Sequence, residues 1–349
     1  MRRRSGVMPN STFDAAEARA REAMSRRGLA RFVIVVLGVL AMPLLSGAQR
    51  PTKVPRLGYL TATSQPARDE AFRRELRRLG YAEPQSIIIE YRSANGRLER
   101  LPDLAAELVG LKMDVIVAGA TPAALAAKKA TDTIPIVMAG VSDPVGSGLI
   151  ASLGRPGGNV SGTSSLAAAV VGKQLELLHE VRPTVSQVAV LWNPANRVFQ
   201  TQQLAEAKAA AKLKVRLQIV EARTPDELDR ALTTIAEQRT QALLVLVDSM
   251  FSPLAARIAE AAVKQRFPAV SGAKEYADAG MLLTYGPNFS DAYGRAATYV
   301  DKILKGARAA DLPVEQATQF ELVINARTAR ALGVTIPQSV VVRADYVLK

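Results

Sequence analysis

Arg56-Leu57-Gly58-Tyr59-Leu60 opens a strand–helix–strand pattern that the chain repeats from Val188-Ala189-Val190-Leu191-Trp192. In both copies, short apolar runs recur at roughly 20- to 30-residue intervals, the length of one βα unit in a parallel sheet. The further runs are Ile87–Ile89, Val115–Ala118 and Ile136–Ala139 in the first copy, and Val215–Val220, Leu243–Val247 and Ala269–Val270 in the second. The repeat predicts two α/β lobes that face each other across a cleft, an arrangement that captures small molecules.

The composition supports two packed lobes. The chain has 349 residues, of which 48% are hydrophobic, and this is enough apolar material for two cores. Aromatic residues make up only 5%, so most of the apolar content is Ala, Val and Leu. Such residues suit helices that pack on buried parallel strands.

The N-terminal segment has the pattern of an export signal. Arg26, Arg27 and Arg31 precede an apolar stretch from Phe32 to Leu45, and Ser46-Gly47-Ala48 follows it. A basic flank, a short apolar core and small residues at −3 and −1 predict cleavage after Ala48. The stretch of about 14 residues is shorter than the roughly 20 that a membrane-spanning helix needs. We therefore expect residues 1–48 to be a signal peptide and the mature protein to be periplasmic.

Charge and cysteine content exclude several classes of protein. The formal charge is +13, and residues 1–48 hold eight arginines and three acids, which leaves 13 − 5 = +8 on the mature chain. The arginines alternate with acids, as in Arg68-Asp69-Glu70 and Arg73-Arg74-Glu75. This pattern predicts solvated helix faces rather than a nucleic-acid or membrane surface. With no cysteine, the chain has no disulfide, thiolate metal site, thiol nucleophile or lipid-bearing cysteine.

Local signals predict where several elements begin and end. Phe72 and Leu76 lie on the apolar stripe of a helix that stops at Gly80. Thr121-Pro122 predicts an N-cap with proline in the first helical turn, and Thr224-Pro225-Asp226-Glu227 predicts an N-cap with a capping box. The glycine-rich segment 154–162 predicts a turn and a crossing between the lobes. The C-terminal tail is too short for a third lobe, so we expect it to complete the other two.

Several motifs then resemble one known family. They cover nearly all of residues 56–348 in order, and they resemble the bacterial ABC-importer substrate-binding proteins often labelled tryptophan/tyrosine transport-like. The matching stretches are Leu79-Gly80-Tyr81, Glu90-Tyr91-Arg92, Ile134-Pro135-Ile136-Val137, Asp143-Pro144-Val145, Gly148-Leu149-Ile150, Arg155-Pro156-Gly157-Gly158-Asn159, Ser161-Gly162, Trp192-Asn193-Pro194, Tyr285-Gly286-Pro287, Asp311-Leu312-Pro313-Val314-Glu315-Gln316, Phe320-Glu321-Leu322-Val323-Ile324-Asn325 and Ala331-Leu332-Gly333.

The resemblance implies a periplasmic-binding-protein-like type I fold. This fold has two doubly wound, Rossmann-like α/β lobes, three crossings between them and a hinge. We expect one lobe at residues 56–165 with about 285–316, and the other at 166–284 with about 317–349. The implied role is that of a monomer without a cofactor that delivers a small solute, such as an amino acid or an aromatic compound, to an ABC permease. The chain departs from the family at Glu75, Ser142 and Ala317, and of these only Ser142 lies near the expected cleft.

A general rule selects the candidate binding residues. Ligands of open α/β sheets bind beyond the carboxyl ends of the strands, near helix N-termini. In the first lobe these positions are Thr61, Thr63, Ser64, Gly119, Ala120, Thr121, Ser142 and Asp143; in the second they are Trp192, Asn193, Asn196, Asp248, Ser249, Gly272, Lys274 and Glu275.

We expect these residues to hold an amino-acid-like ligand. The N–H groups near Thr121–Ala123 and the hydroxyl of Thr63 or Ser64 would receive a carboxylate, because a helix N-terminus favours an anion. Asp248 would accept an ammonium group by a charge-assisted hydrogen bond. The alternative is that Thr121 and Asp248 only cap their helices.

Two further residues have equally plain structural alternatives. Asp143 either lines the cleft or sets a turn with its side chain on nearby amides. Trp192, the only tryptophan, either stacks on a ligand or packs in the core.

Signals for other chemistry are weak. Gly157-Gly158 lacks the spacing of a phosphate-binding loop, so we interpret it as a hinge or turn. His179 is the sole histidine, and we interpret it as a solvated helix residue because one histidine supports neither a multi-histidine metal site nor a catalytic triad.

Three rival interpretations remain open from the residues. The same fold could serve a signalling partner instead of a permease. A secreted α/β enzyme would need a nucleophile with a base, and neither a Gly-x-Ser-x-Gly elbow nor a partnered histidine is present. A cytoplasmic regulator would need a DNA-binding helix-turn-helix where the apolar N-terminal stretch lies.

Overall fold

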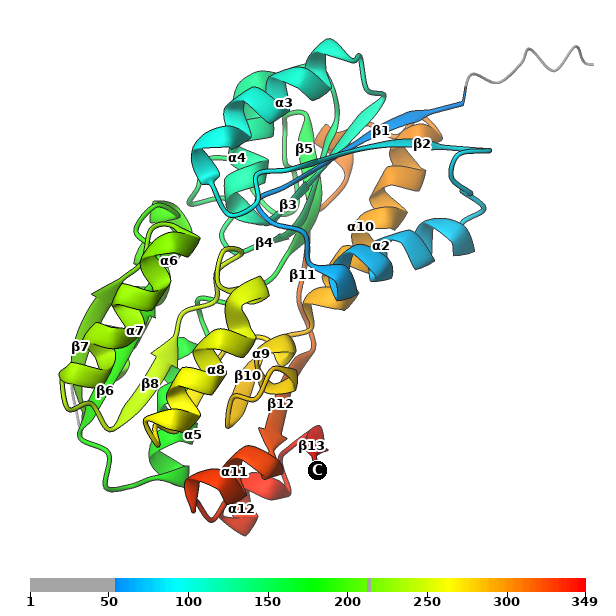
Figure 1. The fold of residues 1–349 in the computed structure, drawn as a ribbon. Helices are drawn as coiled ribbons and strands as arrows, with labels where there is room; N and C mark the ends of the chain where they lie inside the picture. The colour runs from blue at the N-terminus through cyan, green and yellow to red at the C-terminus, as the bar shows by residue number, and fades with distance from the viewer. Residues whose placement is uncertain (1–53, 212–214) are drawn as a thin grey trace, which may run out of the picture. The chain divides into compact units, whose positions relative to one another are not determined.

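The computed structural model describes residues 54–211 and 215–349. Over these ranges the strands form two sheets, one of six strands in the order β11-β5-β4-β3-β1-β2 and one of seven in the order β13-β12-β10-β9-β8-β6-β7 (Figure 1). The two α/β sheets confirm the predicted fold class of two doubly wound lobes. The predicted signal peptide lies outside the described residues.

The first lobe is built around the six-stranded sheet. Its strands are β1 (Arg56–Thr61), β2 (Ile88–Ser93), β3 (Val115–Gly119), β4 (Ile136–Val141), β5 (Val160–Ser164) and β11 (Glu315–Gln316). Its helices are α2 (Pro66–Arg78), η1 (Leu98–Arg100), α3 (Leu101–Gly110), α4 (Ala120–Ala130), α10 (Phe289–Leu304) and η4 (Ala309–Asp311). The pairs in this sheet are parallel, and each predicted apolar run of the first copy overlaps one of its strands.

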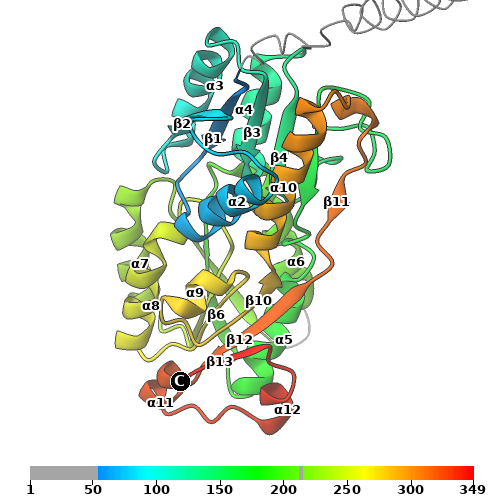
Figure 2. The ribbon, with the colours of Figure 1, turned by 90° about the vertical axis from the view of Figure 1, so that its right-hand side faces the viewer.

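Both faces of this sheet are buried, as a doubly wound lobe requires. Leu57 and Tyr59 of β1 face α2 and α10, whereas the next residue, Leu60, faces α3 and α4. The alternation follows the two-residue period of a strand. Figures 1 and 2 show α10 lying alongside α2, although the two helices are far apart in the sequence.

The second lobe is built around the seven-stranded sheet. Its strands are β6 (Gln187–Trp192), β7 (Arg216–Glu221), β8 (Ala242–Val245), β9 (Ala269–Ser271), β10 (Leu283–Pro287), β12 (Phe320–Asn325) and β13 (Tyr346–Leu348). Its helices are α5 (Val171–Val181), α6 (Arg197–Ala211), η2 (Pro225–Glu227), α7 (Leu228–Glu237), η3 (Ser252–Leu254), α8 (Ala255–Lys264), α9 (Lys274–Asp278), α11 (Ala326–Leu332) and α12 (Gln338–Val341). Strand β12 is antiparallel to β10, and the other pairs are parallel.

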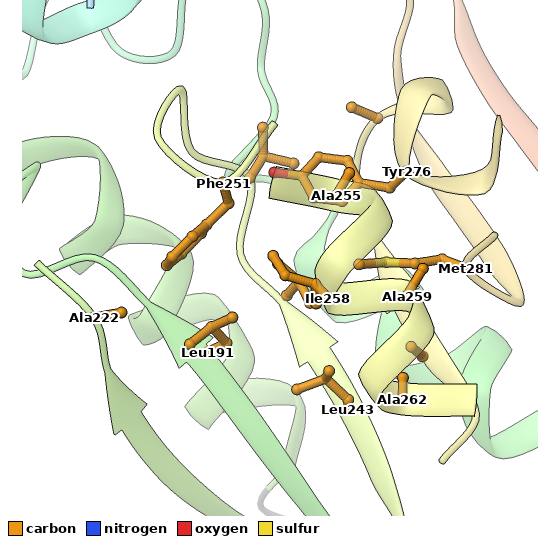
Figure 3. Close-up of a cluster of buried hydrophobic side chains, with 14 of the residues drawn as sticks. Leu191, Ala222, Leu243, Phe251, Ala255, Ile258, Ala259, Ala262, Tyr276 and Met281 are labelled. Atoms are coloured by element: carbon orange, nitrogen blue, oxygen red, sulfur yellow. The ribbon is translucent and has the colours of Figure 1, made fainter. Parts of the chain in front are cut away.

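The second sheet also has two covered faces. On one face Leu191 and Leu243 pack with Ile258 of α8 and Tyr276 of α9 (Figure 3). On the other face, strand residues such as Val190 pack with α5, α6, α11 and α12. Both faces of the second sheet are therefore covered by helices, as in the first lobe.

Three crossings connect the lobes. Residues 165–170 follow β5 and lead into α5, Asn288 joins β10 to α10, and residues 317–319 join β11 to β12. The crossings lie side by side, because the Asn288 N–H donates to the Gln319 carbonyl at 3.2 Å and the Ala317 N–H donates to the Ser164 carbonyl at 2.8 Å. Such short, mutually bonded segments form a hinge.

The prediction that segment 154–162 crosses between the lobes is wrong. This segment connects β4 to β5, and β5 pairs with β4 inside the first sheet. Its glycines serve a turn: Gly157 has a φ of +79°. The crossing comes immediately afterwards, once β5 has ended.

Two predicted helix caps are also corrected. Helix α4 begins at Ala120 with Gly119 as its N-cap, so Thr121 lies inside the first turn. The Thr121 hydroxyl instead accepts from the Ser142 N–H at 3.5 Å. Thr224 is the N-cap of η2 in position, but its side chain makes no capping bond, and the Glu227 carboxylate accepts from the Arg223 N–H at 2.9 Å. The Thr121 hydroxyl is thus bonded to the segment after β4, and the Glu227 carboxylate to the residue before Thr224, instead of the bonds that the capping motifs predicted.

We expect Gly162→Ala to destabilise the first lobe. A Cβ at this position would lie 2.2 Å from the Met138 carbonyl oxygen, and φ is +129°. Because the obstacle is backbone, the free energy of unfolding should fall by about 1–3 kcal/mol in chemical denaturation. The control is Gly172→Ala, whose Cβ would make only an ordinary contact at 3.5 Å. Equal stability of the two variants would contradict this account.

Candidate functional site

The candidate residues lie at the carboxyl ends of the strands of both sheets. In the first lobe Thr61 and Gly119 end neighbouring strands β1 and β3, in register with each other. In the second lobe Trp192 ends β6, and Asp248 follows β8, the strand beside it. Glu275 lies in the first turn of α9. These positions are proposed as one ligand site between the lobes.

Unpartnered hydroxyls mark the first-lobe side. The Oγ1 of Thr63 and the Oγ of Ser142 are buried without a hydrogen-bond partner. Thr61 does not compete for a ligand, because its Oγ1 donates to the Thr63 carbonyl at 2.8 Å. Ser165, which the sequence reasoning missed, adds a third such hydroxyl where the first crossing begins. Buried polar atoms normally have a partner, so these three oxygens are candidates to contact a bound molecule.

Ser64 has a structural role beside any contact with a ligand. Its hydroxyl donates to Asp69 Oδ2 at 2.8 Å, and the same oxygen accepts from the Gln65 N–H at 3.0 Å. The other oxygen of Asp69 accepts from the Tyr59 hydroxyl at 2.7 Å. This network holds the start of α2 against β1. Ser64 also lies on the wall of a cavity beside Arg68 and Glu275.

The start of α4 is pressed against α10. A Cβ on Gly119 would lie 2.8 Å from the Tyr293 hydroxyl, so only glycine fits here. Ala120, the first residue of α4, has a φ of +66°, which is strained for a residue with a side chain. Burial raises the pKa of Tyr293 to about 12, so this hydroxyl stays neutral. The neutral Tyr293 hydroxyl therefore lies next to Gly119, the N-cap of α4.

Asp248 is the centre of the second-lobe side. Its Oδ1 accepts from Asn193 Nδ2 at 3.0 Å and from the Met250 N–H at 2.9 Å, and its Oδ2 accepts from Asn196 Nδ2 at 2.7 Å. The side chain is 1% exposed. The alternative that Asp248 caps a helix is not what the structure shows, because η3 begins at Ser252 with Phe251 as its N-cap.

The electrostatics of Asp248 are unusual. Burial raises the pKa of this carboxyl, although its three amide donors oppose the shift. Among the described residues it makes no salt bridge. A buried charge normally has a counter-charge, and an ammonium group on a ligand would supply one. Next to it, the Ser249 Oγ is buried and unpartnered.

Two glutamines of α6 hold the loops around Asp248 in place. Gln200 accepts from the Asn193 N–H at 2.9 Å and donates to the Val247 carbonyl at 2.9 Å. Gln203 binds both backbone groups of Val247, at 3.0 Å and 2.9 Å. These bonds fix the backbone of Asn193 and Val247 on either side of the Asp248 carboxylate.

Trp192 is half-buried. It packs against the cluster that α5 and α6 share with the second sheet, and its Nε1 is buried without a partner. Gly272 follows β9, and a Cβ there would lie 2.7 Å from both Gln174 Nε2 and a Val247 methyl. Lys274 pairs with Asp278 on the surface of α9 at 2.7 Å. Of these three residues, the structure gives none a contact with the Asp248 carboxylate.

Polar contacts join the lobes. Gln202 Nε2 donates to Asp143 Oδ2 at 2.5 Å, while Asp143 Oδ1 accepts from the Gly146 N–H at 2.8 Å, so Asp143 both sets a turn and lines the interface. Arg68 of the first lobe donates to Glu275 of the second. Although burial disfavours its charged form, Glu275 and Tyr293 raise the pKa of Arg68 overall.

The expectation that Arg68-Asp69-Glu70 is a solvated helix face is wrong for its first two residues. Arg68 is 4% exposed and Asp69 is 9% exposed, whereas Glu70 is on the surface. The helix α2 presents Arg68 and Asp69 to α10 and β1. Charge alternation alone gives no signal for this, because it does not tell which turn of a helix the other elements cover.

Two cavities take walls from both lobes. One, of about 130 Å³, lies beside Arg68 and Glu275; the other, of about 470 Å³, lies beside Asp143 and Gln202. The smaller is lined by Ser64, Gln65, Pro66, Ala67, Arg68, Ser252, Pro253, Glu275 and Ser290. The larger is lined by Ser142, Asp143, Pro144, Val145, Leu153, Ser164, Leu166, Ala168, Ala169, Gln202, Ala205, Glu206 and Gln316.

The described residues contain no cluster of three His, Cys, Asp or Glu side chains arranged to hold a metal ion. They also contain no helix that is both long and apolar enough to cross a membrane.

The family model for ABC transporter substrate binding proteins matches residues 60–348. The chain therefore belongs to this family, which confirms the resemblance and the prediction of a binding protein rather than an enzyme. Across 318 residues it is 28% identical to the tyrosine-binding protein of Clostridioides difficile (strain R20291), covering 86% of this chain and 91% of the relative.

Two solved structures are also similar to this chain. The ABC domain in complex with L-Trp from Streptococcus pneumonia is 27% identical and has a TM-score of 0.76, covering 84% of this chain and 99% of that one. A ligand-free, open structure of a substrate binding protein with adhesive properties from Clostridium difficile is 27% identical with a TM-score of 0.59, covering 85% and 100%.

We expect Asp248→Asn to stabilise the ligand-free protein at pH values where the wild-type carboxyl is ionised. Because its folded-state pKa is raised, Asp248 contributes most stability when protonated, and this contribution is lost as the pH rises from the ordinary value of 3.8 through the raised pKa. Asparagine keeps the shape and removes the charge, and Asn196 can turn its amide over to accept from it. The gain should be on the order of 1 kcal/mol at pH 8 and should shrink toward zero as the pH falls well below 3.8, measured by urea denaturation. A variant less stable than the wild type at pH 8 and at low pH alike would contradict the assigned charge.

Proposed function

We propose that this protein captures an amino acid between its two lobes as the solute-binding component of an ABC importer. The observation that carries the proposal is Asp248, a buried carboxylate with amide donors and no cation among the described residues. The relatives named for tyrosine and crystallised with L-Trp support an aromatic amino acid as the first ligand to test.

The two ends of such a ligand would meet opposite lobes. Its ammonium group would pair with Asp248, and its carboxylate would accept from Thr63, Ser142 and the first turn of α4. Because each lobe supplies one half of the contacts, the ligand binds the closed form better than the open form. That difference in affinity is what shifts the population toward closure.

The side chain of the ligand would use the larger cavity. Its volume of about 470 Å³ falls in the usual range for small-molecule sites, about 300–1,000 Å³. Its walls include apolar groups from the first lobe, the first crossing and α6, such as Leu153, Leu166 and Ala205. An apolar cavity next to a few polar groups is the usual design for such ligands.

The contacts between the lobes support a closed arrangement. The chain matches the L-Trp complex with a TM-score of 0.76 and the ligand-free, open structure with only 0.59 at the same identity. We propose that the contacts of Arg68 with Glu275 and of Asp143 with Gln202 form on closure. A permease in the inner membrane would then recognise the closed shape.

We also propose that the protein works in the periplasm. The signal-like segment 1–48 predicts export and cleavage after Ala48. The captured solute would then be collected in the periplasm. Both halves of the site come from one chain, so a monomer is sufficient.

L-tryptophan or L-tyrosine should raise the stability of the purified protein. At 100 times its dissociation constant a ligand adds about 2.7 kcal/mol, which a thermal-shift assay detects. The control ligand is indole-3-propionate, which keeps the ring and carboxylate of tryptophan but lacks the ammonium group. Equal stabilisation by both compounds would exclude Asp248 as the ammonium acceptor, and no response to any amino acid would reject the proposed solute class.

Asp248→Ala should weaken binding of the amino acid at least tenfold in calorimetry. It removes a charge-assisted hydrogen bond, worth about 1.5–3 kcal/mol. The matched control is Asp229→Asn, an aspartate of the same lobe that is 74% exposed and pairs with Arg257. Unchanged affinity in Asp248→Ala would remove this residue from the site.

A further inference from the structure

Arg68 is a buried cation that belongs to the first lobe. It lies in the first turn of α2 and is 4% exposed. Its guanidinium lies 4.0 Å from the centre of the Phe289 ring and 5.9 Å from that of Tyr293. Both aromatic residues come from α10, which begins directly after the Asn288 crossing. Tyr293 packs in the first-lobe core, whereas Phe289 packs with the second-lobe core, so α10 holds the cation through cation–π contacts at the junction of the lobes.

Among the described residues, the only salt-bridge partner of Arg68 comes from the second lobe. Glu275 lies 207 positions away in the sequence and receives a hydrogen bond from the Arg68 guanidinium. The next residue, Tyr276, is fully buried among the α8 and α9 side chains of the second lobe (Figure 3). Glu275 is therefore attached to the second lobe and moves with it. The Nε of Arg68 is buried without a partner.

Within the described residues, the Arg68–Glu275 pair differs from a second ion pair that joins the lobes, Arg97 with Asp226. Arg97 and Asp226 lie 3.2 Å apart, but their side chains are 51% and 75% exposed, so solvent screens them and they contribute little. The side chain of Arg68 is 5% exposed and that of Glu275 is 32% exposed. When the lobes separate, water can solvate both groups; when they meet, Arg68 loses water and needs an anion.

We propose that Arg68 is a positioning residue that acts through Glu275 as an electrostatic latch, holding a measurable fraction of ligand-free molecules closed and tightening capture of the solute. Tighter capture of the solute rests on the proposed function, because it presupposes the amino-acid ligand. The closed fraction of ligand-free molecules depends on the two lobes alone. Removing only Glu275 leaves a buried unpaired cation, which opposes closure more than removing both partners does.

Closure without ligand tests the latch directly. The chain has no cysteine, so Lys129→Cys in the first lobe and Glu260→Cys in the second give two defined labelling sites for single-molecule energy transfer. The closed fraction should fall at least fivefold in Glu275→Gln and less in Arg68→Met/Glu275→Gln. An equal closed fraction in the wild type and Glu275→Gln, including none in either, would overturn the latch.

Capture is measured by calorimetry with L-tryptophan. Glu275→Gln should weaken binding at least tenfold, and the double variant should bind more tightly than that single variant. Arg97→Gln, on the exposed pair, should change affinity less than twofold. Effects of Arg68→Met and Glu275→Gln that simply add would overturn the coupling. If the wild type binds no amino acid, the proposed function fails, while the closed fractions still decide on the latch.

Discussion

A carboxylate sealed from water with only amide donors around it is the constraint on which the second lobe's site depends. Asp248 draws Asn193, Asn196 and the Met250 N–H toward one point. Behind them, Gln200 and Gln203 hold the loops with bonds to the backbone. The three donors leave the carboxylate well hydrogen-bonded, but none of them supplies a counter-charge. The ligand-free protein therefore carries an energetic cost that a cationic group on a solute would relieve.

The first lobe meets the second with a buried cation, the guanidinium of Arg68. It also buries the carboxylate of Asp69, which is already bonded within the lobe, and its unpartnered side-chain groups at the strand ends are hydroxyls. Under the proposed function, the charges of the closed complex balance: the ammonium group of the solute meets Asp248, and Glu275 meets Arg68. One pair requires the solute and the other does not. This division would let the protein close readily and yet hold only a ligand with an ammonium group.

The sequence predicted which strand ends carry the candidate site, but not which side chains contact one another there. The rule that ligands bind at the carboxyl ends of parallel strands selected Thr63, Ser142 and Asp248, and all three follow strand ends in the structure. Ser142 and Asp248 are buried, and the Oγ1 of Thr63 is buried as well. The rule missed Arg68 and Ser165. Arg68 stands in a run of alternating charges that looks solvated, and its burial comes from α10, more than 200 residues later in the chain. The Thr121 cap failed for a similar reason, since its hydroxyl accepts from the Ser142 N–H after β4. Thr224 is an N-cap in position only, because Glu227 accepts from the Arg223 N–H just before it.

By itself, the sequence determined the two α/β lobes, because each apolar run is a strand whose burial on both faces requires helices on either side. Its motifs also determined the family. Only the tertiary structure decided which polar groups lack partners and which charges lie against each other. Asp248 lies over 50 residues from its asparagine partners, and Arg68 lies 207 from Glu275. Contacts across such separations depend on how sheets and lobes pack, and no local pattern of residues encodes that packing.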